Sequence, residues 1–149
     1  MTCAFCEIIS KTRQADIVYE DEEYVAFKDL VPDAEYHIQL IPKNHIKNVG
    51  ECTKADIPML RSMQQLGNTI LRDQLSSDNN EHLLGTFRFG FHAPGNTSVD
   101  HLHCHCMAGK KKFSTFFTHN SLFPWFVAVD TVINRLSRFP ENRKFLSKE

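Results

Sequence analysis

The sequence has almost no net charge and no long apolar run. Its 17 lysine and arginine residues balance 18 aspartate and glutamate residues, so the formal charge at pH 7 is −1. A balanced charge does not support the phosphate-tracking surface of a general nucleic-acid binder, although it is compatible with a small anionic ligand. No apolar stretch reaches the length of about 18 residues that a membrane span needs, and no basic segment followed by an apolar run marks a secretory signal. We therefore expect a cytoplasmic protein, with the nucleus as a second compartment, and no membrane or nucleic-acid partner.

The sequence also lacks the pattern of a disulfide-stapled fold. Its 5 cysteines are an odd number, and a reducing compartment disfavours disulfides. Against this background the 8 histidines in 149 residues stand out, because histidine and cysteine are usually scarce and both do chemistry. No repeat, linker or low-complexity segment divides the chain, and its length fits one core. We expect a single domain over residues 3–138 and a C-terminal tail over residues 139–149.

Apolar periodicity predicts an α+β fold, with about five strands in a mostly antiparallel sheet and two main helices. Strands are predicted at two runs within residues 17–29 that flank an acidic turn, and at residues 36–41, 84–91 and 99–107. Helices are predicted at residues 53–76, with Thr53 as the N-cap, and at residues 125–138.

Three histidines alternate with apolar residues in the predicted strand 99–107. Side chains two residues apart share one face of a strand, so the imidazoles of His101, His103 and His105 should line a common surface. Imidazoles from one strand point in nearly parallel directions, so a metal would need ligands from elsewhere. The alternative is nucleophilic catalysis, in which one imidazole attacks an electrophile such as phosphorus. Such chemistry needs an anion-holding loop, and Ser98 ends a Gly-Asn-Thr-Ser loop just before His101.

A second candidate site lies at the N-terminus. Cys3 and Cys6 form a C-x-x-C pair, which supplies half of a tetrahedral zinc site. Two reduced cysteines in a frayed terminus are the alternative. A thioredoxin-type redox motif is disfavoured because the predicted elements contain no βαβ unit.

Together these segments resemble the histidine triad (HIT) family. Residues 101–107 match its signature, His-apolar-His-apolar-His-apolar-apolar. Residues 41–45 are similar to its apolar-Pro-Lys-x-His segment, and residues 27–29 to its ribose-contacting Phe-x-Asp segment. The order of these segments extends the resemblance over residues 3–138, and residues 90–94 are most similar to the Hint branch, which includes adenosine 5′-monophosphoramidases.

The resemblance implies a nucleotide hydrolase that cleaves AMP-linked phosphoramidates and acyl-adenylates through a covalent nucleotidyl-histidine. His103 would be the nucleophile, and His105 would contact the phosphate and assist the leaving group. His101 and His45 would support the nucleophile, and Ser98 would bind the leaving-group side of the phosphate. Catalysis would need no cofactor, the ligand would be a purine nucleotide, and the family favours a homodimer.

The same resemblance implies a nucleotide pocket. Asp29 would accept hydrogen bonds from the ribose hydroxyls. Walls around the base would come from apolar residues that also suit an ordinary core, namely Phe5, Ile8, Phe27 and Leu30. The phosphate side would be lined by His92, Asn96, Thr97, Ser98, His103 and His105. His92 and the loop 95–98 depart from the pattern of the best-known Hint proteins, which puts the substrate preference in doubt.

Some members of the family complete a C-x-x-C pair with two histidines, which implies a structural zinc site of Cys3, Cys6, His45 and His101. Three other functions stay open beside the phosphoramidase. They are a dinucleoside polyphosphate hydrolase, a DNA-adenylate hydrolase and a non-catalytic purine-nucleotide-binding interaction protein. The near-zero charge and the missing DNA-binding module disfavour the DNA-adenylate hydrolase.

Overall fold

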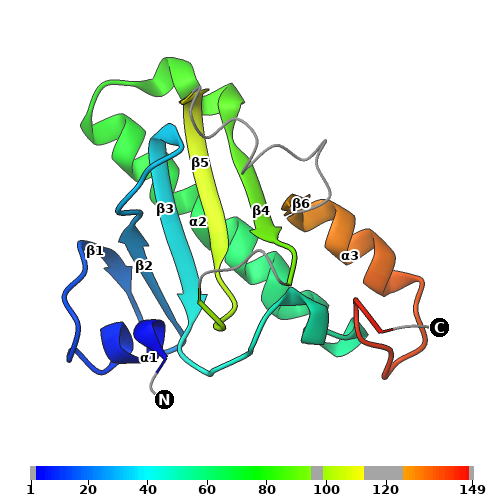
Figure 1. Cartoon of the computed structure of the whole chain (residues 1–149). Coiled ribbons are helices and arrows are strands. Elements are labelled where there is room, and N and C mark those ends of the chain that lie inside the picture. Colours follow the sequence, from blue (N-terminus) through cyan, green and yellow to red (C-terminus); the bar gives the residue numbers. More distant parts are fainter. Residues whose placement is uncertain (1–2, 95–98, 113–125, 148–149) are drawn as a thin grey trace.

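An antiparallel sheet organises the chain in the computed structural model, which describes residues 3–94, 99–112 and 126–147 (Figure 1). Within these residues the sheet has six strands in the spatial order β1-β2-β3-β5-β4-β6. Every neighbouring pair is antiparallel. In chain order the strands are β1 (Ile17–Glu20), β2 (Tyr24–Lys28), β3 (Ala34–Pro42), β4 (Arg88–His92), β5 (Cys104–Lys111) and β6 (Phe126–Ala128).

Helices flank the sheet on both sides. The α-helices are α1 (Ala4–Ile9), α2 (Ile57–Ser77) and α3 (Val129–Ser137), and the short 3₁₀ helices are η1 (Val49–Glu51), η2 (Lys54–Asp56) and η3 (Glu81–Thr86). Figure 1 shows the long helix α2 across one face of the sheet and α1 at the other face. In the described part of the chain, no helix combines the length and apolarity needed to cross a membrane.

The two faces of the sheet contribute to different clusters. In β3, Ile38 and Leu40 face the main core beneath α2, whereas the alternate residue Ile41 joins a smaller cluster with α1. The buried residues of α2 recur every three or four positions, as Leu60, Met63, Gly67, Ile70, Leu71 and Leu75. The α2 side therefore holds most of the apolar core, and the opposite side can carry polar groups.

Helix α2 crosses β5 closely at Gly67. A Cβ atom at this position would lie 2.6 Å from the Sγ of Cys106 and 3.2 Å from the Cε1 of Phe89. Only a residue without a side chain fits at this position. The glycine therefore lets α2 lie directly on β5, the strand that carries His105.

Two predicted strands begin later than expected. The strand predicted at 84–91 starts at Arg88, because the preceding residues form η3, in which Leu83 is buried while Leu84 is exposed. The strand predicted at 99–107 starts at Cys104. The N–H of Leu102 donates to the carbonyl of Ile46 at 2.6 Å instead of joining the sheet ladder.

The helix boundaries also need correction. The helix predicted at 125–138 begins at Val129, because Phe126–Ala128 pair with β4 as the additional strand β6. The helix predicted from Thr53 begins at Ile57 after the turn η2. The N–H of Thr53 donates to the Asp56 carboxylate at 2.8 Å, so the predicted pair does mark this helix start.

The segment after residue 138 packs back onto the domain. Phe145 is buried in the main core, and its N–H donates to the carbonyl of Cys52 at 2.8 Å. The N–H of Leu146 donates to the carbonyl of Gly50 at 3.3 Å. The described part of the predicted tail is thus joined to the connection between β3 and α2.

Candidate active site and metal centre

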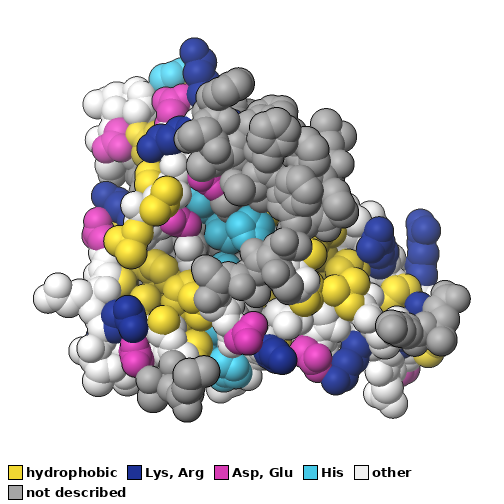
Figure 2. All heavy atoms as spheres, in the orientation of Figure 1, with side chains coloured by type: hydrophobic (Ala, Val, Ile, Leu, Met, Phe, Trp, Pro, Cys, Tyr) yellow, Lys and Arg dark blue, Asp and Glu magenta, His cyan; other side chains and the backbone are white. Residues whose placement is uncertain are grey.

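The three alternating histidines lie on the sheet face opposite α2. His105 is on β5, and His101 and His103 are on the segment that enters this strand. All three are buried, while Leu102, Cys104 and Cys106 turn to the core beneath α2. Figure 2 shows histidine side chains near the centre of this face. The alternation predicted from sequence is confirmed, although only the third histidine belongs to the strand.

A backbone contact fixes the protonation of His103. Its Nδ1 lies 2.6 Å from the carbonyl oxygen of His101, which can only accept a hydrogen bond. Nδ1 therefore carries the proton of the neutral ring, and Nε2 keeps its lone pair. Burial lowers the pKa of His103, so the ring stays neutral at pH 7. These properties suit a nucleophile.

A fourth buried histidine, His37 on β3, supports His105. The backbone N–H of Asp33 donates to His37 Nδ1 at 3.0 Å, so the neutral ring of His37 holds its proton on Nε2. This Nε2 donates to His105 Nδ1 at 2.8 Å. The proton of His105 is therefore placed on its Nε2. Burial lowers the pKa of His37 to about 4 and that of His105 well below its usual value.

Sequence reasoning gave His37 no role. The histidine is on the predicted strand 36–41, and in the sheet Gln39 lies opposite His105, so His37 is the diagonal neighbour of His105. The sequence does place His37 on a predicted strand. Its contact with His105 could not be predicted, because it depends on the register in which β3 pairs with β5.

Asp29 follows β2 and reaches the same group. Its Oδ2 accepts a hydrogen bond from Gln39 Nε2 at 2.6 Å and lies 3.4 Å from His37 Nε2. Its Oδ1 accepts the backbone N–H of Val31 at 2.9 Å. The carboxylate is thus oriented by two donors and lies 4.0 Å from His105 Nδ1. Asp29, His37 and His105 bring three atoms that could bind a metal close together. The hydrogen bond between the two histidines explains this proximity without a metal.

Three of the four predicted base-wall residues lie together beside the nucleophile. Phe5, Ile8 and Phe27 are buried in one cluster. The ring of Phe5 packs edge to face against Phe27 at 5.2 Å and against His103 at 5.1 Å between ring centres. Leu30 is 95% exposed and does not pack in this cluster.

On the predicted phosphate side, His92 lies at the end of β4. Its ring centre is 4.5 Å from that of His105, with 34° between the ring planes. His92 therefore lies beside His105. Asn96, Thr97 and Ser98 lie outside the described residues, as does Trp125.

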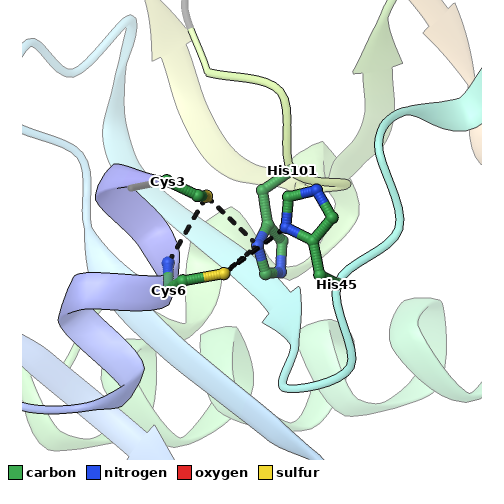
Figure 3. A group of neighbouring side chains, drawn as sticks. All are labelled: Cys3, Cys6, His45 and His101. Atoms are coloured by element: carbon green, nitrogen blue, oxygen red, sulfur yellow. Dashed lines mark hydrogen bonds between the residues drawn. The ribbon is translucent and has the colours of Figure 1, made fainter. Parts of the chain in front are cut away.

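The four predicted zinc ligands, which include the first triad histidine, lie close together (Figure 3). The Sγ atoms of Cys3 and Cys6 each lie 3.5 Å from His101 Nδ1, and Cys6 Sγ lies 3.4 Å from His45 Nδ1. The four donor atoms all lie within 4.8 Å of one another. Sulfur and nitrogen ligands of a tetrahedral zinc ion lie about 3.6 Å apart, as computed from the usual Zn–S and Zn–N distances. The residues present therefore fit zinc.

The chemistry of the donor set agrees with this geometry. His101 Nε2 donates to the carbonyl of Pro42 at 2.8 Å, which leaves Nδ1 unprotonated toward the two sulfur atoms. Metal-binding histidines commonly have their other ring nitrogen held in this way. Two thiolates and two neutral imidazoles would make a closed structural zinc site, with no position for substrate.

The chain is similar in sequence to known proteins. Residues 2–119 match the family described as "Scavenger mRNA decapping enzyme C-term binding". The chain is 30% identical to adenosine 5′-monophosphoramidase HINT3 of Xenopus tropicalis over 139 residues, which are 91% of this chain and 88% of the relative. This chain belongs to the histidine triad family. It is also 38% identical over 108 residues to the bifunctional adenosine 5′-phosphosulfate phosphorylase/adenylylsulfatase HINT4 of Arabidopsis thaliana, covering 71% of this chain and 69% of that protein.

Solved structures confirm the HIT-like fold. A histidine triad protein from Clostridium difficile has a TM-score of 0.63 and 30% identity, covering 75% of this chain and 94% of that one. A HIT family hydrolase from Clostridium thermocellum has a TM-score of 0.61 and 31% identity, covering 73% and 91%. The predicted α+β class and its two main helices are thus confirmed, and the described residues form six strands where about five were predicted.

This histidine triad protein also has a hollow that none of the triad histidines lines. Its volume is about 690 Å³, and it lies between the C-terminal half of α2 and the strands β1 to β3. Tyr19, Tyr36, Asp73 and Asp78 are among its lining residues. The Tyr36 hydroxyl donates to Asp78 at 2.7 Å on its rim. Asp29 and His37 also line this hollow, so it adjoins the group of side chains around His105.

Proposed function

We propose that this protein hydrolyses AMP-linked phosphoramidates and acyl-adenylates through a covalent nucleotidyl intermediate on His103. Membership of the histidine triad family makes it a nucleotide hydrolase, and the relatives named adenosine 5′-monophosphoramidase support the finer assignment. The observation that carries the proposal is the hydrogen bond from His103 Nδ1 to the His101 carbonyl. It leaves a buried, neutral Nε2 as the attacking atom.

In the first displacement, His103 Nε2 attacks the α-phosphorus. A bond from Nε2 to phosphorus forms while the bond from phosphorus to the leaving nitrogen breaks. The leaving nitrogen takes the electron pair of that bond and a proton from solvent, while the Nε2–H of His105 donates a hydrogen bond to the phosphate and so assists departure. The ring of His105 lies 5.0 Å from that of His103, so one phosphate group can contact both.

In the second displacement, water attacks the phosphorus and loses a proton to solvent. The bond from phosphorus to His103 Nε2 breaks, its electron pair returns to the ring, and AMP leaves. His37 keeps His105 in one tautomer throughout, because the Asp33 N–H occupies its other nitrogen. The Nε2–H of His105 therefore stays directed away from His37, where it can donate to the phosphate in both displacements.

The nucleoside would lie between Asp29 and the aromatic cluster. The Asp29 carboxylate is held by Gln39 and the Val31 N–H, so it can accept hydrogen bonds from the ribose hydroxyls without moving. Phe5 and Phe27 would contact the base, and the exposed Leu30 would cover it from outside. Both contacts favour AMP and AMP conjugates as ligands.

The decisive experiment uses His103→Ala with an AMP amide as substrate. We expect kcat to fall at least about 1,000-fold, because the nucleophile is removed, while AMP still binds in a calorimetric titration. In wild-type protein, alkaline quenching and mass spectrometry should detect adenylyl-histidine on His103. His82→Ala is the matched control, because His82 is exposed on η3 and outside the triad. Full turnover by His103→Ala would overturn the proposal.

A substrate panel separates the remaining candidates. AMP amides, acyl-adenylates, diadenosine polyphosphates and adenylated DNA ends should be compared by kcat/KM. We expect the first two classes to be preferred. A preference for diadenosine polyphosphates or adenylated DNA would replace the phosphoramidase assignment, and AMP binding without turnover of any class would indicate a nucleotide-binding interaction protein.

A further inference from the structure

One residue belongs both to the group of zinc-ligand side chains and to the catalytic group. The imidazole of His101 points its Nδ1 at Cys3 and Cys6, whereas the backbone carbonyl of the same residue accepts the proton of His103. The carbonyl of Pro42 holds the remaining ring nitrogen of His101. A ligand that fixes this imidazole therefore also fixes the carbonyl that orients the nucleophile.

A second connection passes through α1. Phe5 lies between the two cysteines in sequence, and its ring packs against both His103 and His101, at 5.1 and 6.1 Å between ring centres. The sulfur of Cys3 also accepts the N–H of Cys6 at 3.4 Å and so caps this helix. A helix of 6 residues is too short to be stable alone. The position of Phe5 must therefore come from the contacts that anchor α1.

Burial of Phe5 and Ile8 in the apolar cluster holds α1 on the sheet, but the contacts between its two cysteines and the histidines are weak. The cysteine sulfurs approach the His101 ring at 3.5 Å, and His45, which would complete the site, is exposed in a loop. Thiol groups make only weak hydrogen bonds, whereas zinc bonds to thiolate and imidazole are short and directional. Metal would replace loose contacts with a closed set of four bonds, and both links to His103 would become rigid.

We infer that Cys3, Cys6 and His45 are positioning residues for catalysis, because zinc held by them and by His101 sets the carbonyl and the aromatic ring that orient His103. The inference rests on the proposed function, since it concerns the same nucleophile. The metal touches neither substrate nor reacting atoms. The chain thus has zinc-dependent turnover without catalytic zinc.

Reciprocity gives a test that does not depend on activity. If zinc orders the His103 side of the nucleotide site, zinc strengthens AMP binding, and AMP must strengthen zinc binding by the same factor. We expect the dissociation constant of Zn²⁺, measured by competition with a chromophoric chelator, to fall at least about threefold when AMP is saturating.

The outcomes of this titration separate the two proposals. An unchanged zinc affinity in the presence of bound AMP would overturn the coupling and leave the hydrolase proposal standing. A protein that binds AMP but no zinc would also overturn the coupling alone. Absence of AMP binding to the zinc-loaded protein would contradict both.

Variants provide the kinetic counterpart. His45→Ala should weaken zinc binding and lower kcat by at least about tenfold at a fixed, limiting concentration of free zinc, and excess zinc should partly restore kcat. His82→Ala, at another exposed histidine, should change neither quantity. Cys6→His, which keeps a zinc ligand, should retain more activity than Cys6→Ser at equal melting temperature. Equal kcat in wild-type protein and His45→Ala, with zinc bound only by the former, would contradict the inference.

Discussion

At the scale of single residues, backbone groups assign a proton to each histidine of the site. The Asp33 N–H, the His101 carbonyl and the Pro42 carbonyl fix the tautomers of His37, His103 and His101. A hydrogen bond between two side chains then fixes His105. The tautomers of His37, His101 and His103 therefore follow from backbone groups whose character does not change with pH, and that of His105 follows from His37.

Burial of neutral His37 predicts a pH-dependent stability. Its pKa is about 4 in the folded protein and about 6.5 when unfolded, so the unfolded chain takes up the proton first as pH falls. Stability from this residue is fully present above pH 6.5 and is lost between pH 6.5 and about 4, by about 3 kcal/mol. The groups that act on His37 are Asp29, Arg88, His92, His103 and His105.

Urea unfolding at several pH values measures this loss. His37→Gln should reduce the slope of unfolding free energy against pH by up to about 1.4 kcal/mol per pH unit in this window, the value for one proton. His82→Gln should leave the slope unchanged, because that side chain is exposed. An identical slope in His37→Gln and wild-type protein would show that His37 is not buried neutral.

The candidate site residues that the sequence indicated are close together along the chain. His101, His103 and His105 alternate within one segment, and Cys3 and Cys6 form a short motif, so their spacing alone groups them. His37 could not be grouped in this way, because its contact with His105 spans 68 positions and depends on how β3 pairs with β5. Its contact with the triad is a property of strand register.

At the scale of elements, the sequence predicted a strand or helix correctly where the element has one apolar face. The hairpin β1–β2, strand β3 and helix α2 follow such patterns. The short strand β6 was missed because a buried Phe126 also fits the apolar pattern of the helix that follows. Its pairing with His92 joins residues 34 positions apart, and no local sequence pattern indicates it. Thr86 and Phe87 have high β propensity, but residues 84–86 belong to the 3₁₀ helix η3, and β4 begins only at Arg88.

The contact between α2 and β5 predicts that Gly67→Ala is destabilising. Alanine favours helices over glycine by about 1 kcal/mol, but its Cβ would lie 2.6 Å from Cys106 Sγ. Separating helix from strand should cost more than the gain, for a net loss of about 1–3 kcal/mol. Urea midpoints measure the effect, with Thr69→Ala on the exposed side of the same helix as control. A gain in stability on Gly67→Ala would show that the helix can move away without cost.

At the scale of the whole molecule, the C-terminal segment joins parts that are distant in sequence. Phe145 enters the core, its N–H binds the carbonyl of Cys52, and the guanidinium of Arg135 on α3 lies 5.5 Å from its ring centre. Phe145→Ala should lower the free energy of unfolding by about 2–4 kcal/mol through lost burial. Leu146→Ala, at a neighbour that is 50% exposed, should have a much smaller effect. Equal losses in the two variants would contradict an anchoring role for Phe145.

The long separation of Cys3 from His101, 98 positions along the chain, has a consequence for biosynthesis. Cys3 and Cys6 are synthesised 98 and 95 residues before their partner His101. During translation the nascent chain therefore carries two thiols without their final ligand set. Helix α1 can pack early on Phe27 and Ile41, which are near in sequence, but the contacts of its cysteines with His101 must form late. The metal-ligand set is thus completed only after the helix that carries half of it has a place to pack.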